Sequence, residues 1–154
     1  MIEVEAASKV YGTATREIWA VRDISLSVGG GEFVSIVGPS GCGKSTLLNM
    51  IAGFEAPTAG QIRVAGGRVA GQIPDGLGYI FQKDTVLPWY TVRQNIALGL
   101  RYRGRPAGEI DEKVGALATL AGLEGFEELY PHELSGGMRR RLALGPLFSD
   151  SWWA

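Results

Sequence analysis

Short apolar runs separated by glycine-containing turns make up the first half of the chain. Residues 2–10 alternate loosely between apolar and polar side chains and predict an edge strand that ends at Tyr11 and Gly12. Residues 19–28 show a similar alternation and predict a half-buried strand. Residues 61–65 predict another short strand, after the turn-forming residues 57–60. Together these runs predict a small β layer.

Two further runs are apolar without alternation, which is typical of strands buried on both faces of a sheet. They are residues 33–37 and residues 77–81. Gln82 stands at the carboxyl end of the second run, where α/β folds place their ligand contacts, so it is a candidate site residue. An apolar helix is predicted over residues 47–51 and stops at Gly53. These features predict an α/β fold.

Helical periodicity dominates the second half. Thr91 has the side chain of an N-cap and predicts a helix over 92–100. Apolar residues recur at helical spacing over 110–121 and predict an amphipathic helix that ends at Gly122. The loop predicted over 101–108 carries arginines beside acidic residues, which indicates a solvated surface.

Composition limits the classes of protein to consider. With 154 residues, the chain can form one domain with a substantial core, but not two full domains. Its 15 basic and 16 acidic residues leave no electrostatic footprint for nucleic acid. No apolar run is long enough to span a bilayer, and the N-terminus lacks a signal-peptide profile, so we expect a cytosolic chain. The single cysteine, Cys42, excludes an internal disulfide and is interpreted as a small loop residue.

One stretch combines residue types and spacing that dictate a chemistry, the phosphate-binding loop pattern G-x-x-x-x-G-K-[ST]. It consists of Gly38, Pro39, Ser40, Gly41, Cys42, Gly43, Lys44, Ser45 and Thr46. Its glycines let successive N–H groups point into one concavity, which suits an anion. Lys44 adds a positive charge for the β and γ phosphates, and the Ser45 hydroxyl is suited to ligate Mg²⁺. We therefore predict a nucleoside triphosphate with magnesium as the ligand.

A second glycine-containing motif precedes a basic, apolar run. It consists of Leu134, Ser135, Gly136, Gly137 and Met138. A helix is predicted to start on the two glycines, so the backbone amides and the Ser135 hydroxyl form a second anion-binding helix N-terminus. Two phosphate sites separated by a helical insert cannot easily close on one nucleotide within one subunit. This arrangement predicts a head-to-tail dimer.

The order of the phosphate loop, Gln82 and residues 134–137 resembles the nucleotide-binding subunit of ABC transporters, up to about Leu144. The resemblance implies a P-loop NTPase fold of ABC type, with a RecA-like core, a β subdomain and a helical subdomain, and with the C-terminal part missing. It divides the chain into a β and phosphate-loop part (1–86), a helical insert (87–133), a signature helix (134–144) and a divergent tail (145–154).

The resemblance also implies roles for individual residues, with ATP and Mg²⁺ as cofactors. Tyr11 matches the aromatic residue that stacks on adenine. Gln82 matches a contact to Mg²⁺ and water, beside the Mg²⁺ ligand Ser45. The signature residues, Leu134 to Met138, match the motif that contacts ATP held by the opposite subunit.

Within the family, residues 79–84 followed by Leu87, Pro88 and Trp89 resemble importers of nitrate, sulfonate and taurine. The implied partners are transmembrane permease subunits, a second ATP-binding subunit and, indirectly, a solute-binding protein, with no nucleic acid. The chain would then lie on the inner face of the cell membrane. The function expected is coupling of ATP binding and hydrolysis to uptake of a small solute.

The sequence departs from the family after the signature helix. The family continues into an apolar strand that ends in adjacent Asp and Glu, whereas residues 145–154 contain no such pair, and Asp150 is not assigned to metal binding. The family's switch histidine is also missing, since the lone histidine, His132, precedes the signature and is interpreted as a surface or interface residue. No catalytic residue is assigned. The alternative function is therefore a hydrolysis-deficient nucleotide-binding fragment, from a truncated or frame-shifted ATPase. A P-loop kinase or GTPase would leave residues 134–137 without a role.

Overall fold

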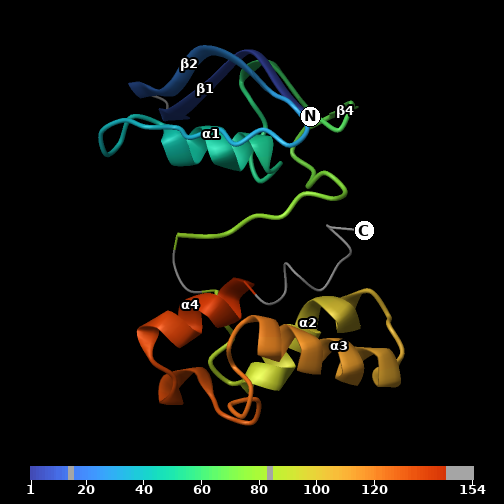
Figure 1. Cartoon of the computed structure of the whole chain (residues 1–154). Helices are drawn as coiled ribbons and strands as arrows, with labels where there is room; N and C mark the ends of the chain where they lie inside the picture. Colours follow the sequence, from blue (N-terminus) through green and yellow to red (C-terminus); the bar gives the residue numbers. More distant parts are fainter. Residues whose placement is uncertain (14–15, 83–84, 145–154) are drawn as a thin grey trace. The chain divides into compact units, whose positions relative to one another are not determined.

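The computed structural model describes residues 1–13, 16–82 and 85–144. The chain divides into two compact units, Met1–Leu77 and Gly78–Ala154 (Figure 1). Each unit has its own cluster of buried apolar side chains. The four-part division inferred from the sequence stays a prediction.

The first unit contains a four-stranded antiparallel sheet with the order β2-β1-β3-β4. Its strands are β1 (Ile2–Thr13), β2 (Arg16–Val28), β3 (Ala59–Val64) and β4 (Gly67–Arg68). The prediction that the first strand lies at an edge is wrong, because Val4 of β1 pairs with Leu26 on one side and Ile62 on the other. The strand also continues beyond Gly12, which pairs with Glu17.

Helix α1 (Lys44–Ile51) packs against one face of this sheet (Figure 1). Side chains from the sheet and the helix, including Val4, Ile62 and Met50, are almost completely buried there. Each such side chain contributes roughly 1.5–3 kcal/mol to stability. A helix of 8 residues is too short to be stable alone. Its conformation therefore depends on packing against the sheet.

Gly53 ends the α1 segment, as the sequence predicts. Its φ is +78°, and an added Cβ would lie 2.0 Å from the carbonyl oxygen of Gln72. Since only glycine combines that backbone conformation with so close an approach, the chain can leave α1 along this path only with glycine at position 53.

The two apolar runs predicted as buried strands, residues 33–37 and 77–81, are not strands in the described part of the chain. The Phe33 and Val37 side chains are 93% and 89% exposed, and Ile80 is 63% exposed. Of these runs, Ile36 packs against the core of the first unit. A strand forms only where a neighbouring strand hydrogen-bonds its backbone, and neither run pairs with a strand among the described residues. Apolar composition therefore did not suffice to make these runs strands.

The second unit is helical, with α2 (Val92–Tyr102), α3 (Ala107–Leu120), the 3₁₀ helix η1 (Pro131–Glu133) and α4 (Gly136–Leu144). The predicted N-cap is confirmed, because the Thr91 hydroxyl accepts from the Gln94 amide and the Gln94 side chain accepts from the Thr91 amide. The predicted apolar face of α3 is also confirmed. It buries Val114, Leu117 and Ala118 in a cluster shared with α2 and α4.

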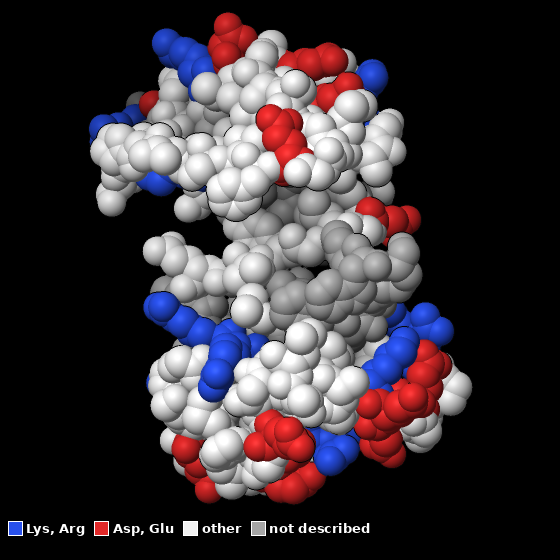
Figure 2. All heavy atoms as spheres, in the orientation of Figure 1, with Lys and Arg blue, Asp and Glu red and all other residues white. Residues whose placement is uncertain are grey.

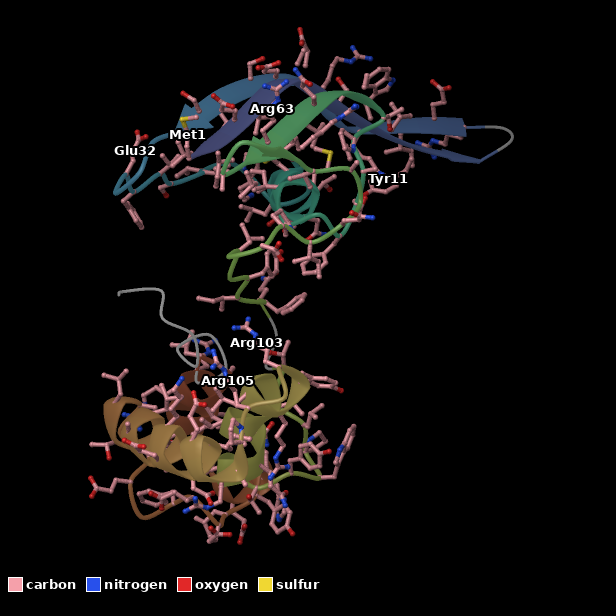
Figure 3. The ribbon with its side chains drawn as sticks, turned by 90° about the vertical axis from the view of Figure 1, so that its right-hand side faces the viewer. Met1, Tyr11, Glu32, Arg63, Arg103 and Arg105 are labelled. Atoms are coloured by element: carbon pink, nitrogen blue, oxygen red, sulfur yellow. The ribbon has the colours of Figure 1, made fainter. Side chains whose placement is uncertain are left out.

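The loop between α2 and α3 is shorter than predicted, because α2 continues to Tyr102 and α3 begins at Ala107. Figure 3 labels two of its arginines, Arg103 and Arg105, which are exposed as expected. Acidic and basic side chains are interspersed on the face of each unit that Figure 2 shows. No helix in the described ranges is both long and apolar enough to cross a lipid bilayer.

Buried Asn95 organises the segment that leads into α2. Its Oδ1 accepts from the Leu87 amide at 2.8 Å. Its Nδ2 donates to the carbonyl oxygens of Leu87, Tyr90 and Thr91 at 3.2, 3.0 and 3.0 Å. One side chain therefore supplements the backbone hydrogen bonds of residues 87–91, in which the Tyr90 amide donates to the Leu87 carbonyl and the Asn95 amide to the Thr91 carbonyl.

Replacing Asn95 with Ala should destabilise the second unit by about 2 kcal/mol, because it removes the partner of the partly buried Leu87 amide and Tyr90 carbonyl. Urea unfolding followed by circular dichroism measures this change. Thr119→Ala, on the exposed face of α3, is the control and should change stability by less than about 0.5 kcal/mol. Equal stability of the two variants would contradict the role assigned to Asn95.

Candidate nucleotide-binding site

The predicted phosphate loop runs directly into α1 and is pressed against β2. Gly43, the N-cap residue of α1, has φ of +95°, and an added Cβ would lie 2.1 Å from the carbonyl oxygen of Ala20. Gly41 also lies in the left-handed region, with φ of +80°. These two positions require glycine because side chains with a Cβ disfavour that conformation, and at Gly43 also because β2 leaves no room.

The N-terminus of α1 is open to an anion. The first helical hydrogen bond runs from the Leu47 amide to the Gly43 carbonyl at 2.9 Å. The amides of Lys44, Ser45 and Thr46 precede that bond, no side chain caps the helix, and its first turn has no acidic residue. Their N–H groups and the positive end of the helix dipole therefore favour a negatively charged ligand.

Lys44 adds an ammonium group above the same loop. Its Nζ donates to the carbonyl oxygens of Gly38 and Pro39, at 2.7 Å each, and lies 3.7 Å from the Cys42 sulfur. Phosphate oxygens can replace these carbonyl oxygens as acceptors, and such charge-assisted hydrogen bonds are the stronger ones. The loop thus concentrates amide donors and a cation at one point, which fits a triphosphate.

The same loop offers an oxygen for magnesium. Ser45 is exposed in the first turn of α1, and Mg²⁺ is commonly held by one or two protein oxygens together with phosphate oxygens and water. No group of three or more His, Cys, Asp or Glu side chains that could hold a metal occurs among the described residues. The residues present fit a magnesium ion that arrives with the triphosphate.

Tyr11 lies beside α1, near the end of β1 (Figure 3). Its hydroxyl donates to the Glu55 carboxylate, and the side chain of Thr46, in the first turn of the helix, is close enough to lower the pKa of Tyr11. The structure therefore brings Tyr11 together with the phosphate loop within one unit. No sequence pattern marks Glu55 as a site residue, because it is 44 residues from Tyr11 and lies in an ordinary turn region.

The environment shifts the pKa of both partners. Burial of the ring and the hydrogen bond to Glu55 raise the pKa of Tyr11, and the Thr46 side chain opposes this. Hydrogen bonds from Tyr11, Lys9 and Asn49 lower the pKa of Glu55, against a smaller opposing effect of burial. At neutral pH a protonated phenol therefore donates to an ionised carboxylate.

The signature motif lies in the second unit, at the start of α4. The prediction that a helix starts there is confirmed: the Ser135 hydroxyl accepts from the Met138 amide at 3.3 Å, and its carbonyl accepts from Arg139 at 3.0 Å. Leu134 is buried and Met138 is half-buried against the core of this unit, while Gly136 and Gly137 are exposed. Apolar packing thus fixes the motif on both sides of its two exposed glycines.

The remaining candidates have different outcomes. Gln82 is exposed and belongs to the second unit, and its contact with Mg²⁺ stays a prediction. His132 is exposed, as predicted, and its ring stacks on that of Tyr130 with 5.8 Å between centroids. The divergent tail, including Asp150, lies outside the described residues.

Comparisons with known proteins give consistent results. The model of the family described as ABC transporter matches residues 21–151. The taurine import ATP-binding protein TauB of Roseobacter denitrificans is 44% identical over 128 residues, which are 82% of this chain and 47% of that protein. The nitrate import ATP-binding protein NrtD of Synechocystis is 41% identical over 143 residues, 93% of this chain and 53% of that protein. The chain thus spans about half the length of these relatives.

A solved structure is also similar, the dimeric post-hydrolysis state of the ATP-binding cassette MJ0796 bound to ADP and Pi. The TM-score is 0.84 at 30% identity, and the match covers 97% of this chain and 69% of the other. At this level of identity and coverage, the likeness extends to nearly the whole described backbone.

The pKa of Tyr11 can be measured from the near-ultraviolet absorbance of ionised tyrosine. The difference between the unsubstituted chain and Tyr11→Phe should titrate above the ordinary value near 10.0. Glu55→Gln should lower that midpoint, because it removes the carboxylate that favours the protonated phenol. Tyr102→Phe, in the second unit, should leave this transition in place. A midpoint at or below the ordinary value would show that the Tyr11–Glu55 contact is absent in solution.

Proposed function

This chain belongs to the ABC transporter family, and on that premise we propose that it binds ATP with Mg²⁺ as the ATP-binding subunit of an importer. One observation carries the proposal: the uncapped N-terminus of α1 and the Lys44 ammonium converge on the same loop. Such a site binds a phosphate chain through backbone N–H donors that all point toward one ligand position.

Each candidate residue has a proposed part in holding the nucleotide. The amides of residues 38–46 and Lys44 hold the phosphates, and Tyr11 stacks on the adenine. Ser45 and Gln82 hold Mg²⁺, which supplies neutralisation of the phosphate charge when bound. Ser135, Gly136 and Gly137 contact the terminal phosphate of ATP held by a second subunit. The exposed glycines of α4 support that last assignment, since a phosphate can approach their amides closely.

The proposed partners follow from the same assignment. A second ATP-binding subunit would complete the site, as in a head-to-tail dimer, and the similar solved cassette is dimeric. Permease subunits would dock on the helical unit near Gln82, on the cytoplasmic face of the membrane. The segment organised by Asn95 supports this docking, because it presents Trp89 with 66% of its surface exposed.

The transported solute is proposed only as a class. Relatives with 41–44% identity are named for import of taurine, nitrate, spermidine/putrescine and sulfate/thiosulfate. Because similar ATPases carry such different names, the solute must be recognised mainly by other components. We propose a small solute of the nitrate, sulfonate or taurine type, delivered by a solute-binding protein, on the resemblance of residues 79–89.

Replacement of Lys44 tests whether its ammonium group and the N-terminus of α1 form a phosphate-binding site. Lys44→Ala should weaken Mg-ATP binding by about 10- to 100-fold, because it removes charge-assisted hydrogen bonds to phosphate. Isothermal titration calorimetry measures the affinity. The matched control is Lys113→Ala, which removes a lysine that pairs with Glu109 at 2.9 Å on α3 and should leave the affinity unchanged. Unchanged affinity in Lys44→Ala would overturn the proposal.

Phosphate release separates full ATPase function from the alternative, nucleotide binding without turnover. A positioned general base contributes about 10²–10⁴ in rate. The alternative therefore predicts that residues 1–154 bind ATP but release phosphate at least about 100-fold more slowly than a full-length relative. Turnover at the rate of the relative would contradict the alternative and support full ATPase function.

A further inference from the structure

We propose that Glu55 is a positioning residue for Tyr11: it fixes the ring so that one face is presented to a nucleobase. This inference rests on the proposed function, since it concerns the base of the same nucleotide. It adds a residue outside the phosphate loop and the signature motif to the binding site.

Glu55 is held by several contacts at the point where it meets Tyr11. The Tyr11 hydroxyl donates to a carboxylate oxygen of Glu55. Lys9 lies 3.4 Å from the same carboxylate, and its Nζ also donates to the Ala56 carbonyl at 2.8 Å. The Lys9 and Glu55 side chains are only 17% and 27% exposed. The acceptor of the Tyr11 hydroxyl is therefore itself held in place.

The segment that carries Glu55, residues 54–58, is hydrogen-bonded to two neighbouring elements. The Phe54 amide donates to the Asn49 carbonyl at 3.0 Å, which ties this segment to α1. The Thr58 amide donates to the Ser8 carbonyl at 2.8 Å, and the Thr58 hydroxyl accepts from the Val10 amide at 3.1 Å, which ties it to β1. Residues 54–58 are thus fastened both to the helix and to the strand that carries Tyr11.

The surroundings of the Tyr11 ring leave part of it exposed. The Lys9 ammonium lies over one face, 5.4 Å from the ring centroid. The Tyr11 residue is nevertheless 41% exposed, so part of its surface is open to a ligand. The hydroxyl is held by Glu55, beyond the last turn of α1, and the Thr46 side chain in the first turn is close enough to lower its pKa. The ring is therefore oriented relative to the helix whose N-terminus is proposed to bind the phosphates.

The negative charge of Glu55 is balanced by a neighbouring cation. A lone carboxylate near a triphosphate would repel it, but the Lys9 ammonium beside Glu55 compensates its charge. An untethered aromatic side chain would lose conformational freedom when a base stacks on it, and this loss would weaken binding. Because the Glu55 contact already restricts the ring in the folded protein, this loss of freedom occurs on folding and not on binding. The ligand that benefits is a nucleobase, and the triphosphate alone gains nothing from it.

The experiment compares the affinities of the full chain for Mg-ATP and for magnesium tripolyphosphate, which lacks the base. Glu55→Ala should weaken ATP binding about three- to tenfold and leave tripolyphosphate binding unchanged. Glu55→Gln should retain most of the preference for ATP, since an amide oxygen still accepts from the Tyr11 hydroxyl. Tyr11→Phe keeps the ring but removes the hydroxyl, so it should behave like Glu55→Ala.

The double variant separates positioning from a general structural role. In the Tyr11→Phe background, Glu55→Ala should cause no further loss, because the contact is already absent. Equal weakening of both ligands by Glu55→Ala, an unchanged preference for ATP, or full additivity in the double variant would each overturn the positioning role. Binding of tripolyphosphate by every variant confirms that the phosphate loop is folded. If the unsubstituted chain fails to bind either ligand, the proposed function fails and this inference fails with it.

Discussion

The close approach of the phosphate loop to β2 is the constraint on which the candidate site depends. Gly43 lies so near the Ala20 carbonyl that a Cβ would approach that oxygen to 2.1 Å. This contact sets the direction in which α1 leaves the loop, and so the direction in which its uncapped amides point. The antiparallel sheet thus serves binding indirectly, as the surface against which a flexible, glycine-rich segment takes one conformation. Without that backing, the amides would have no common target.

Helix α1 links the groups proposed to bind the phosphates with the groups proposed to bind the base. Its first turn carries the amides proposed as phosphate donors and Thr46, and the segment beyond its last turn carries Glu55. Tyr11, which belongs to β1, contacts both. Because an isolated helix of this length is unstable, packing of Met50 and Leu47 on the sheet maintains the whole arrangement. Nucleotide binding should in turn stabilise this unit, since it favours the folded state by mass action.

The two units differ in which hydrogen bonds satisfy the polar groups of their backbones. In the helical unit, local hydrogen bonds, the Thr91 capping box and Asn95 satisfy the polar groups around α2. In the first unit, long-range strand pairing does so, yet residues 33–37 take no part in it. The exposed Phe33 side chain leaves roughly 1.5–3 kcal/mol of hydrophobic stabilisation unrealised. Residues 33–37 are therefore a less stabilised part of the first unit than its sheet.

The sequence by itself determined the glycine-rich turn before α1, the Thr91 cap, the apolar face of α3 and the helix that starts at the signature glycines, because each depends on spacing within a few residues. The order of its motifs also determined the family and the ABC type of fold, which the comparisons confirm. Only the tertiary structure decided that β1 lies inside the sheet, that residues 33–37 and 77–81 form no strand in the described part of the chain, and that Glu55 meets Tyr11. These outcomes depend on which distant segment supplies a hydrogen-bond partner, and neither apolar periodicity nor turn chemistry encodes that choice.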